Sequence, residues 1–66
     1  MCLSTVYFHT PDAPEEIMRD VARMEAEGRG FWLINLFGEK KFVEGTVRIV
    51  DLVDTHEVVL DPVNQP

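Results

Sequence analysis

The segment from Phe31 to Phe37 constrains the fold of this chain more than any other part of the sequence. It reads Phe-Trp-Leu-Ile-Asn-Leu-Phe, so a strand formed here carries large apolar side chains on both faces. A chain of 66 residues has little core with which to cover both faces, since folding at this size buries only about 60% of the unfolded surface. We therefore expect a sheet that closes on itself and a second copy of the chain that covers the remaining apolar surface.

Four further segments are rich in β-branched and aromatic residues and are separated by short turn sequences. They are Leu3–His9, Lys41–Val43, Thr46–Val53 and His56–Leu60. This pattern predicts an all-β fold, namely a small SH3-like, half-closed β-barrel of about five to six short strands. We expect the barrel domain to span residues 1–60. Residues 61–66, which include two prolines, are expected to form a flexible C-terminal tail.

The segment from Asp12 to Gly28 has two interpretations. Asp12 as N-cap, Glu15 at the capping-box position and Gly28 as terminator favour a helix. The alternation of apolar and charged residues over 22–27 favours a half-buried strand. The local signals favour the helix, and a short helix within 13–20 and a strand both stay open on the residues alone.

The charge balance limits the classes of partner. Twelve acidic and six basic residues give a formal net charge of −6, which repels phosphate backbones and disfavours nucleic acid.

The longest uninterrupted apolar run, Phe31 to Ile34, is far shorter than the roughly 20 residues that cross a bilayer. The single cysteine cannot form an internal disulfide. We therefore expect a soluble, cytoplasmic protein with no membrane partner.

Catalysis finds little support in the sequence. Neither His9 nor His56 has a neighbouring nucleophile. Gly28 and Gly30 lack the third glycine and the following helix of a nucleotide-binding loop, so we interpret them as turn residues. The expectation is that the protein is not an enzyme and has no catalytic residue.

Cys2 is the candidate metal ligand. If the initiator Met1 is removed, the thiolate and the α-amine of Cys2 close a five-membered chelate, and a metal can displace both protons near neutral pH. If Met1 stays, its amine, the Cys2 amide nitrogen and the thiolate offer three donors that suit square-planar Ni(II) or Cu(II). On the residues alone, the alternative is that Cys2 is simply a small apolar residue at the start of a strand.

The two histidines are weaker candidates. Cys2 and His9 are seven positions apart, which is about 23 Å in an extended strand, so one ion cannot bind both within a straight strand. His56 opens the last predicted strand, where a histidine most often is an ordinary surface residue.

Five short motifs follow one another in a characteristic order. They are Met1-Cys2 leading directly into a strand, Leu-Phe-Gly-Glu-Lys at 36–40, Gly45, Ile-Val-Asp-Leu at 49–52 and Val-Val-Leu at 58–60. In this order and spacing the chain resembles the CooT family over roughly residues 1–60. The resemblance implies a small cytoplasmic nickel-binding protein associated with nickel delivery to carbon monoxide dehydrogenase. Some members of that family carry the label of predicted RNA-binding protein.

For this chain the resemblance implies Cys2 as the metal ligand and gives neither histidine a role. It also implies a homodimeric small β-barrel, in which the ambiguous segment forms two short strands near Glu16–Arg19 and Val21–Glu27. The loop from His9 to Pro14 is longer and richer in proline than the family pattern, so the short helix within 13–20 stays as the alternative.

The leading hypothesis is a metallochaperone-type protein that holds Ni(II) at the N-termini of a homodimer through Cys2 of each chain. The expected partners are a second copy and a nickel-requiring client, such as carbon monoxide dehydrogenase or its maturation factors. One alternative is a small RNA-binding barrel that stacks bases on Tyr7, Phe31, Trp32 and Phe42. Another is a metal-free protein-interaction module that uses its surplus apolar surface.

Overall fold

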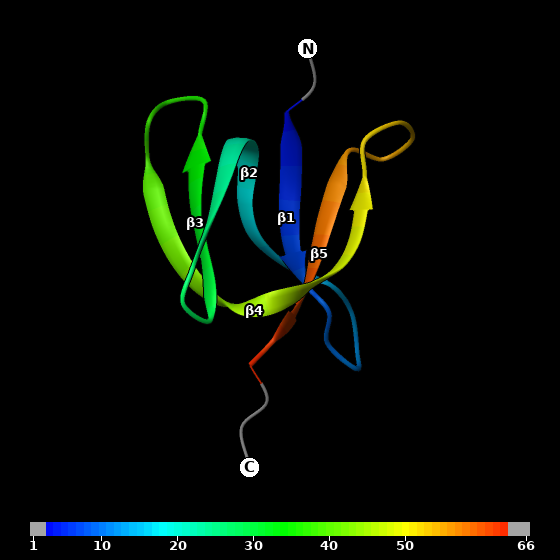
Figure 1. Cartoon of the computed structure of the whole chain (residues 1–66). Helices are drawn as coiled ribbons and strands as arrows, with labels where there is room; N and C mark the ends of the chain where they lie inside the picture. Colours follow the sequence, from blue (N-terminus) through cyan, green and yellow to red (C-terminus); the bar gives the residue numbers. More distant parts are fainter. Residues whose placement is uncertain (1–2, 64–66) are drawn as a thin grey trace.

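The computed structural model describes residues 3–63 as five strands without a helix (Figure 1). The strands are β1 (Ser4–Phe8), β2 (Glu15–Glu27), β3 (Gly30–Asn35), β4 (Lys40–Asp51) and β5 (Glu57–Pro62). They form a closed barrel in sequence order. Sequential neighbours pair antiparallel, whereas β1 and β5 pair in parallel and close the ring. The predicted all-β fold is confirmed.

β2 is one bent strand that pairs with two different neighbours. Its first part pairs with β1 and its second part with β3, and Val21 lies opposite both Ser4 and Asn35. Immediately before this changeover, Asp20 has a positive φ of 55°. Aspartate tolerates this left-handed conformation better than most residues with a side chain. The bend at Asp20 therefore lets one strand serve both sides of the barrel.

The short helix considered within 13–20 is wrong. From Glu15 onward the backbone is extended, because its amide and carbonyl groups pair with β1 and then with β3. The capping signals around Asp12 are local, and the ladder partners that outweigh them come from distant parts of the chain. The two short strands predicted near 16–19 and 21–27 correspond to the two halves of β2.

β4 is shared between neighbours in the same way. Its residues up to Glu44 pair with β3, and its residues from Gly45 onward pair with β5. A Cβ added at Gly45 would lie 2.6 Å from the carbonyl oxygen of Asp61, so the close approach of two strands requires glycine here. The sequence pattern predicts two separate segments, Lys41–Val43 and Thr46–Val53. In the structure one strand continues through Gly45 and ends at Asp51.

Each strand contributes to a small core. The buried apolar residues are Val6, Val21, Leu33, Val43, Val58 and Leu60. Leu33 fills the interior from β3, while Trp32 and Ile34 on the other face of that strand stay half-exposed. Within one chain, the two-faced apolar strand is therefore covered on its inner face.

Asn35 ends β3 earlier than the apolar pattern predicts. Its Oδ1 accepts hydrogen bonds from the backbone N–H groups of Phe37 (3.0 Å) and Glu39 (2.9 Å). Its Nδ2 donates to the Glu39 carboxylate at 2.6 Å. These bonds form the β3–β4 turn, which places Leu36 and Phe37 in solvent with 57% and 76% of their surface exposed.

The end of the last strand also differs from the expected boundary. Asp61 and Pro62, which were expected to begin the C-terminal tail, belong to β5 and pair with β4. Residues 64–66 lie outside the described residues. Among residues 3–63, no helix is long and apolar enough to cross a membrane.

Gly30 supplies a test of the packing between β3 and β4. A Cβ at Gly30 would overlap the backbone carbonyl of Val43 on the paired strand, so Gly30→Ala must push the strands apart. We expect a loss of about 1–3 kcal/mol or more in the free energy of unfolding, measured by urea denaturation followed by circular dichroism.

Gly28→Asn is the matched control. Gly28 has a positive φ of 59°, a conformation that asparagine tolerates, and a Cβ added there would have no heavy atom within 4 Å. The unfolding midpoint of this variant should stay close to that of the wild type. Equal midpoints for Gly30→Ala and Gly28→Asn would contradict the packing argument.

Candidate functional site

The candidate metal ligand Cys2 lies outside the described residues, which begin with its neighbour Leu3. Leu3 is half-buried, and Ser4, the first residue of β1, is buried with 8% of its surface exposed. Figure 1 shows this end of β1 at the same end of the barrel as the β3–β4 turn and the β4–β5 loop. We call this end the N-terminal rim.

His56 lies at the N-terminal rim. Its carbonyl oxygen accepts a hydrogen bond of 3.0 Å from the backbone N–H of Thr5, because β1 and β5 run in parallel. His56 has a positive φ of 53°, which is uncommon for a residue with a side chain. Its Nδ1 is buried and has no hydrogen-bond partner in the described part of the chain. A buried imidazole nitrogen without a partner is uncommon, and the residue that bears this one lies beside Thr5, near the start of β1.

His9 lies at the opposite end of β1. Its backbone N–H donates to the carbonyl oxygen of Leu60 at 2.8 Å, and its side chain is exposed. About 13 Å of strand separate its position from Thr5. The fold therefore does not bring the two histidines together, and His56 is the one that lies near the start of β1.

An apolar groove opens at the N-terminal rim. It has a volume of about 280 Å³ and is lined by Ser4, Val21, Ala22, Arg23, Met24, Val50, Leu52 and Val58. Ser4 belongs to the groove, so the chain enters β1 directly beside it. Val50 and Leu52, on the β4 side, have 53% and 59% of their surface exposed. This end of the barrel therefore presents apolar side chains that one chain leaves uncovered.

The β4–β5 loop beside the groove is held by Asp51. Its Oδ1 accepts hydrogen bonds from the backbone N–H groups of Asp54 (2.9 Å) and Val53 (3.1 Å). These bonds favour the carboxylate and hold the pKa of Asp51 below its ordinary value. The loop is thereby ordered, and it leaves Val53 with 84% of its surface exposed.

The described residues do not by themselves assemble a metal site. Within residues 3–63, no three side chains of His, Cys, Asp or Glu converge in a way that could hold an ion. From the sequence, His56 was interpreted as an ordinary surface residue. Its position beside Thr5 depends on the parallel register of β1 and β5, and no local signal in the sequence indicates that register.

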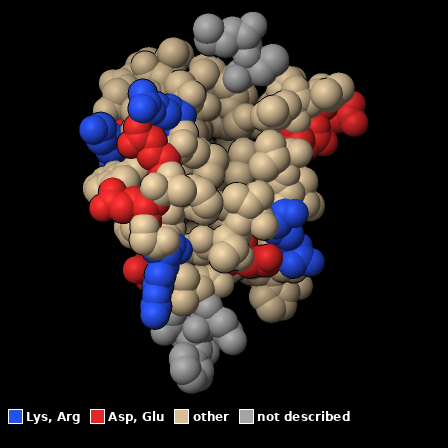
Figure 2. Space-filling model, in the orientation of Figure 1, with Lys and Arg blue, Asp and Glu red and all other residues tan. Residues whose placement is uncertain are grey.

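The four aromatic residues proposed for stacking bases do not gather on one surface. Trp32 and Phe42 are neighbours, with ring centroids 5.2 Å apart and planes inclined by 59°. Phe31 packs against the core, whereas Tyr7 belongs to β1. Figure 2 shows acidic and basic side chains interspersed on the displayed face. On the face that Figure 2 displays, the described residues form no continuous basic groove of the kind that binds single strands.

Comparisons with known proteins bear on the fold and on the family. The crystal structure of a protein from Carboxydothermus hydrogenoformans, described as a CooT, is similar with a TM-score of 0.87 and 24% sequence identity. The match covers 96% of this chain and 100% of that one, and at this identity it shows a shared fold. A comparison with curated proteins found no match.

The family described as "CO dehydrogenase accessory protein CooT" matches residues 1–61, which is nearly the whole chain. The description is that of an accessory protein rather than an enzyme, in agreement with the expectation from the sequence. It also connects the protein with the CO dehydrogenase system. The chain belongs to the CooT family of CO dehydrogenase accessory proteins.

Proposed function

We propose that this protein binds Ni(II) through Cys2 at the N-terminal rim of a homodimer and delivers it to CO dehydrogenase as a metallochaperone. The observation that carries the proposal is the position of the start of β1. Ser4, the first residue of β1, lines the apolar groove. Thr5 bonds the backbone of His56, whose Nδ1 has no partner among the described residues. Family membership supports the connection with CO dehydrogenase.

The donor chemistry favours nickel. A thiolate and an amine or amide nitrogen from each Cys2 supply two sulfur and two nitrogen donors when two N-termini meet. This soft, mixed set suits square-planar Ni(II) and disfavours hard cations such as Mg²⁺. Cu(II) and Zn(II) compete for the same donors, so the metal available in the cell contributes to selectivity. His56 can add an imidazole nitrogen at the same rim.

The apolar surface of the rim supports a dimer. Leu36, Phe37, Leu52 and Val53 are all more than half exposed, on the two loops at the same end of the barrel as the start of β1. A two-fold axis at this rim would cover these side chains with their own copies and bring the two N-termini together. The single chain leaves this surface in contact with water, which costs free energy.

The other two hypotheses have less support. An RNA-binding barrel needs clustered cations, whereas this chain has a net charge of −6 and dispersed basic residues. A metal-free interaction module would use the same apolar rim but would show no dependence on Cys2. A metal titration therefore separates it from the nickel hypothesis.

Replacement of Cys2 by serine tests the ligand. A serine hydroxyl does not ionise near neutral pH, so Cys2→Ser should abolish high-affinity nickel binding while the fold persists. The measurement is a Ni(II) titration followed by thiolate-to-nickel charge-transfer absorbance and by calorimetry. Because the metal displaces protons from sulfur and nitrogen, affinity of the wild type should fall as the pH drops below about 7.

The histidines provide matched controls for this titration. His9→Ala changes the far end of β1 and should leave nickel affinity unchanged. His56→Ala removes a nitrogen at the same rim and should weaken binding less than Cys2→Ser does. Nickel binding by Cys2→Ser as tight as that of the wild type would contradict the proposal.

A charge at the rim tests the dimer. Leu52→Glu places two carboxylates near the proposed two-fold axis, and since Leu52 is 59% exposed, the fold of one chain should tolerate it. Light scattering at tens of micromolar protein should show a dimer for the wild type and a monomer for this variant. Ile49→Glu is the control, because Ile49 is similarly exposed at 50% but does not line the groove. A monomeric wild type, or a Leu52→Glu dimer of unchanged affinity, would rule out this interface.

A further inference from the structure

The outer face of the sheet formed by β2, β3 and β4 carries an ordered set of side chains, of which only Arg23 also lines the groove at the N-terminal rim. The strand register arranges them in three rows. These are Arg23–Ile34–Lys40, Glu25–Trp32–Phe42 and Glu27–Gly30–Glu44. We call these nine residues the three-row face. Gly30 has no side chain, and the side chains of the other eight point away from the core, since the alternate residues Leu33 and Val43 are buried.

Charge changes sign along the three-row face. The first row carries the cations Arg23 and Lys40 on either side of Ile34, and the third row carries the carboxylates Glu27 and Glu44 on either side of Gly30. Arg23 also forms an ion pair of 2.5 Å with Glu25 of the middle row. A ligand that complements this face must be basic at one end and acidic at the other.

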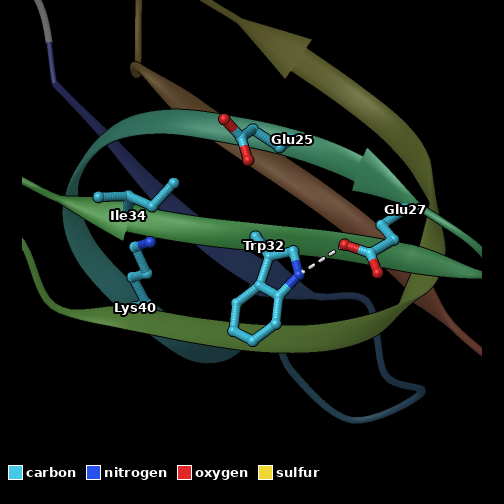
Figure 3. Close-up of a pocket in the computed structure, with 5 residues that line it drawn as sticks. All are labelled: Glu25, Glu27, Trp32, Ile34 and Lys40. Atoms are coloured by element: carbon cyan, nitrogen blue, oxygen red, sulfur yellow. Dashed lines mark hydrogen bonds between the residues drawn. The ribbon is translucent and has the colours of Figure 1, made fainter.

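The middle of the face holds a fixed aromatic surface. The indole N–H of Trp32 donates to Oε1 of Glu27 at 2.9 Å, and its ring packs against Phe42 at a centroid distance of 5.2 Å. Beside the ring is a hollow of about 150 Å³ lined by Glu25, Glu27, Trp32, Ile34 and Lys40 (Figure 3). An aromatic side chain held in place before binding loses little conformational freedom on contact with an apolar group.

The size of the face limits the ligand. Three strands and five residues along each give a face of about 10 Å by about 13 Å. The area of this face is far smaller than the roughly 800 Å² that each partner buries in a stable interface. These nine residues alone are therefore too few to hold a second copy of the chain. Successive rows are two residues apart, or about 6.6 Å, which equals the spacing of same-side residues in an extended peptide.

We propose that the three-row face docks a short extended segment of a partner protein. Alternate residues of that segment would place a basic side chain over Glu27 and Glu44, an apolar one on Trp32 and Phe42, and an acidic one beside Lys40. This contact is separate from the nickel site and is expected to be transient, because its area is small. It would let the protein recognise a partner while the N-terminal rim holds metal.

The test uses a peptide probe and the full chain without metal. The probe is acetyl-Arg-Ser-Leu-Ser-Glu-amide, and the control peptide of equal composition is acetyl-Arg-Ser-Glu-Ser-Leu-amide. Trp32 is the one tryptophan of the chain, so its indole N–H gives a single indole signal in a ¹H–¹⁵N NMR spectrum. We expect the probe to shift this signal in a saturable way and to bind roughly threefold or more tightly than the control peptide.

Two charge-reversal variants locate the contact. Glu44→Lys reverses one carboxylate of the third row and should weaken probe binding by roughly threefold, the size expected of one exposed ion pair. Asp12→Lys changes the net charge equally at an exposed position before β2 and should leave affinity unchanged. Nickel binding should be normal in both variants, which separates a failure here from a failure of the metal site.

Four outcomes would overturn the proposal. One is the lack of a saturable shift at millimolar probe, and another is equal affinity for the two peptides. A third is an indole shift that depends on protein concentration alone, which would indicate a second copy on this face. The fourth is tighter binding of oligouridylate than of the probe at physiological salt, which would indicate RNA.

Discussion

Two long strands that change partners halfway along hold this barrel together. β2 passes from β1 to β3 at Val21, and β4 passes from β3 to β5 at Gly45. The backbone carbonyl of Asp20 accepts a hydrogen bond of 2.9 Å from Leu36, so the bend in β2 is fixed to the β3–β4 turn. Without these changeovers, five short strands could not enclose the core. An internal disulfide could not stabilise the chain in place of the core, since the chain has one cysteine.

The strands were predictable where local pattern and pairing agree. β-branched and aromatic runs located β1, β3 and β5 to within a few residues. The local signals around Asp12 wrongly favoured a helix, because capping signals act within a few residues, whereas the ladders that extend β2 come from strands before and after it. The two strands were indicated by the family resemblance and not by the local pattern. Prediction also failed at Asn35, since an apolar run does not show that an amide side chain will bind the turn and end the strand.

The two sites depend on different kinds of information. Cys2 was predicted as a metal ligand from the chemistry of its thiol and amine and from family resemblance. Neither argument requires knowledge of the three-dimensional fold. The placement of His56 beside Thr5 and the rows around Trp32 need the register of paired strands, which sequence alone does not supply. A sequence shows which residues have useful chemistry, whereas strand register decides which of them become neighbours.

The parallel closure of the ring has a consequence for synthesis on the ribosome. β1 leaves the exit tunnel before β5, which is its partner on one side and ends at Pro62. The β2–β3 and β3–β4 hairpins can form from local contacts while the chain grows, whereas Val6 and its neighbours must wait for the last strand. The barrel therefore closes only after β5 has been synthesised and has left the tunnel, and until then the nascent protein exposes the apolar side of β1 to chaperones and to other chains.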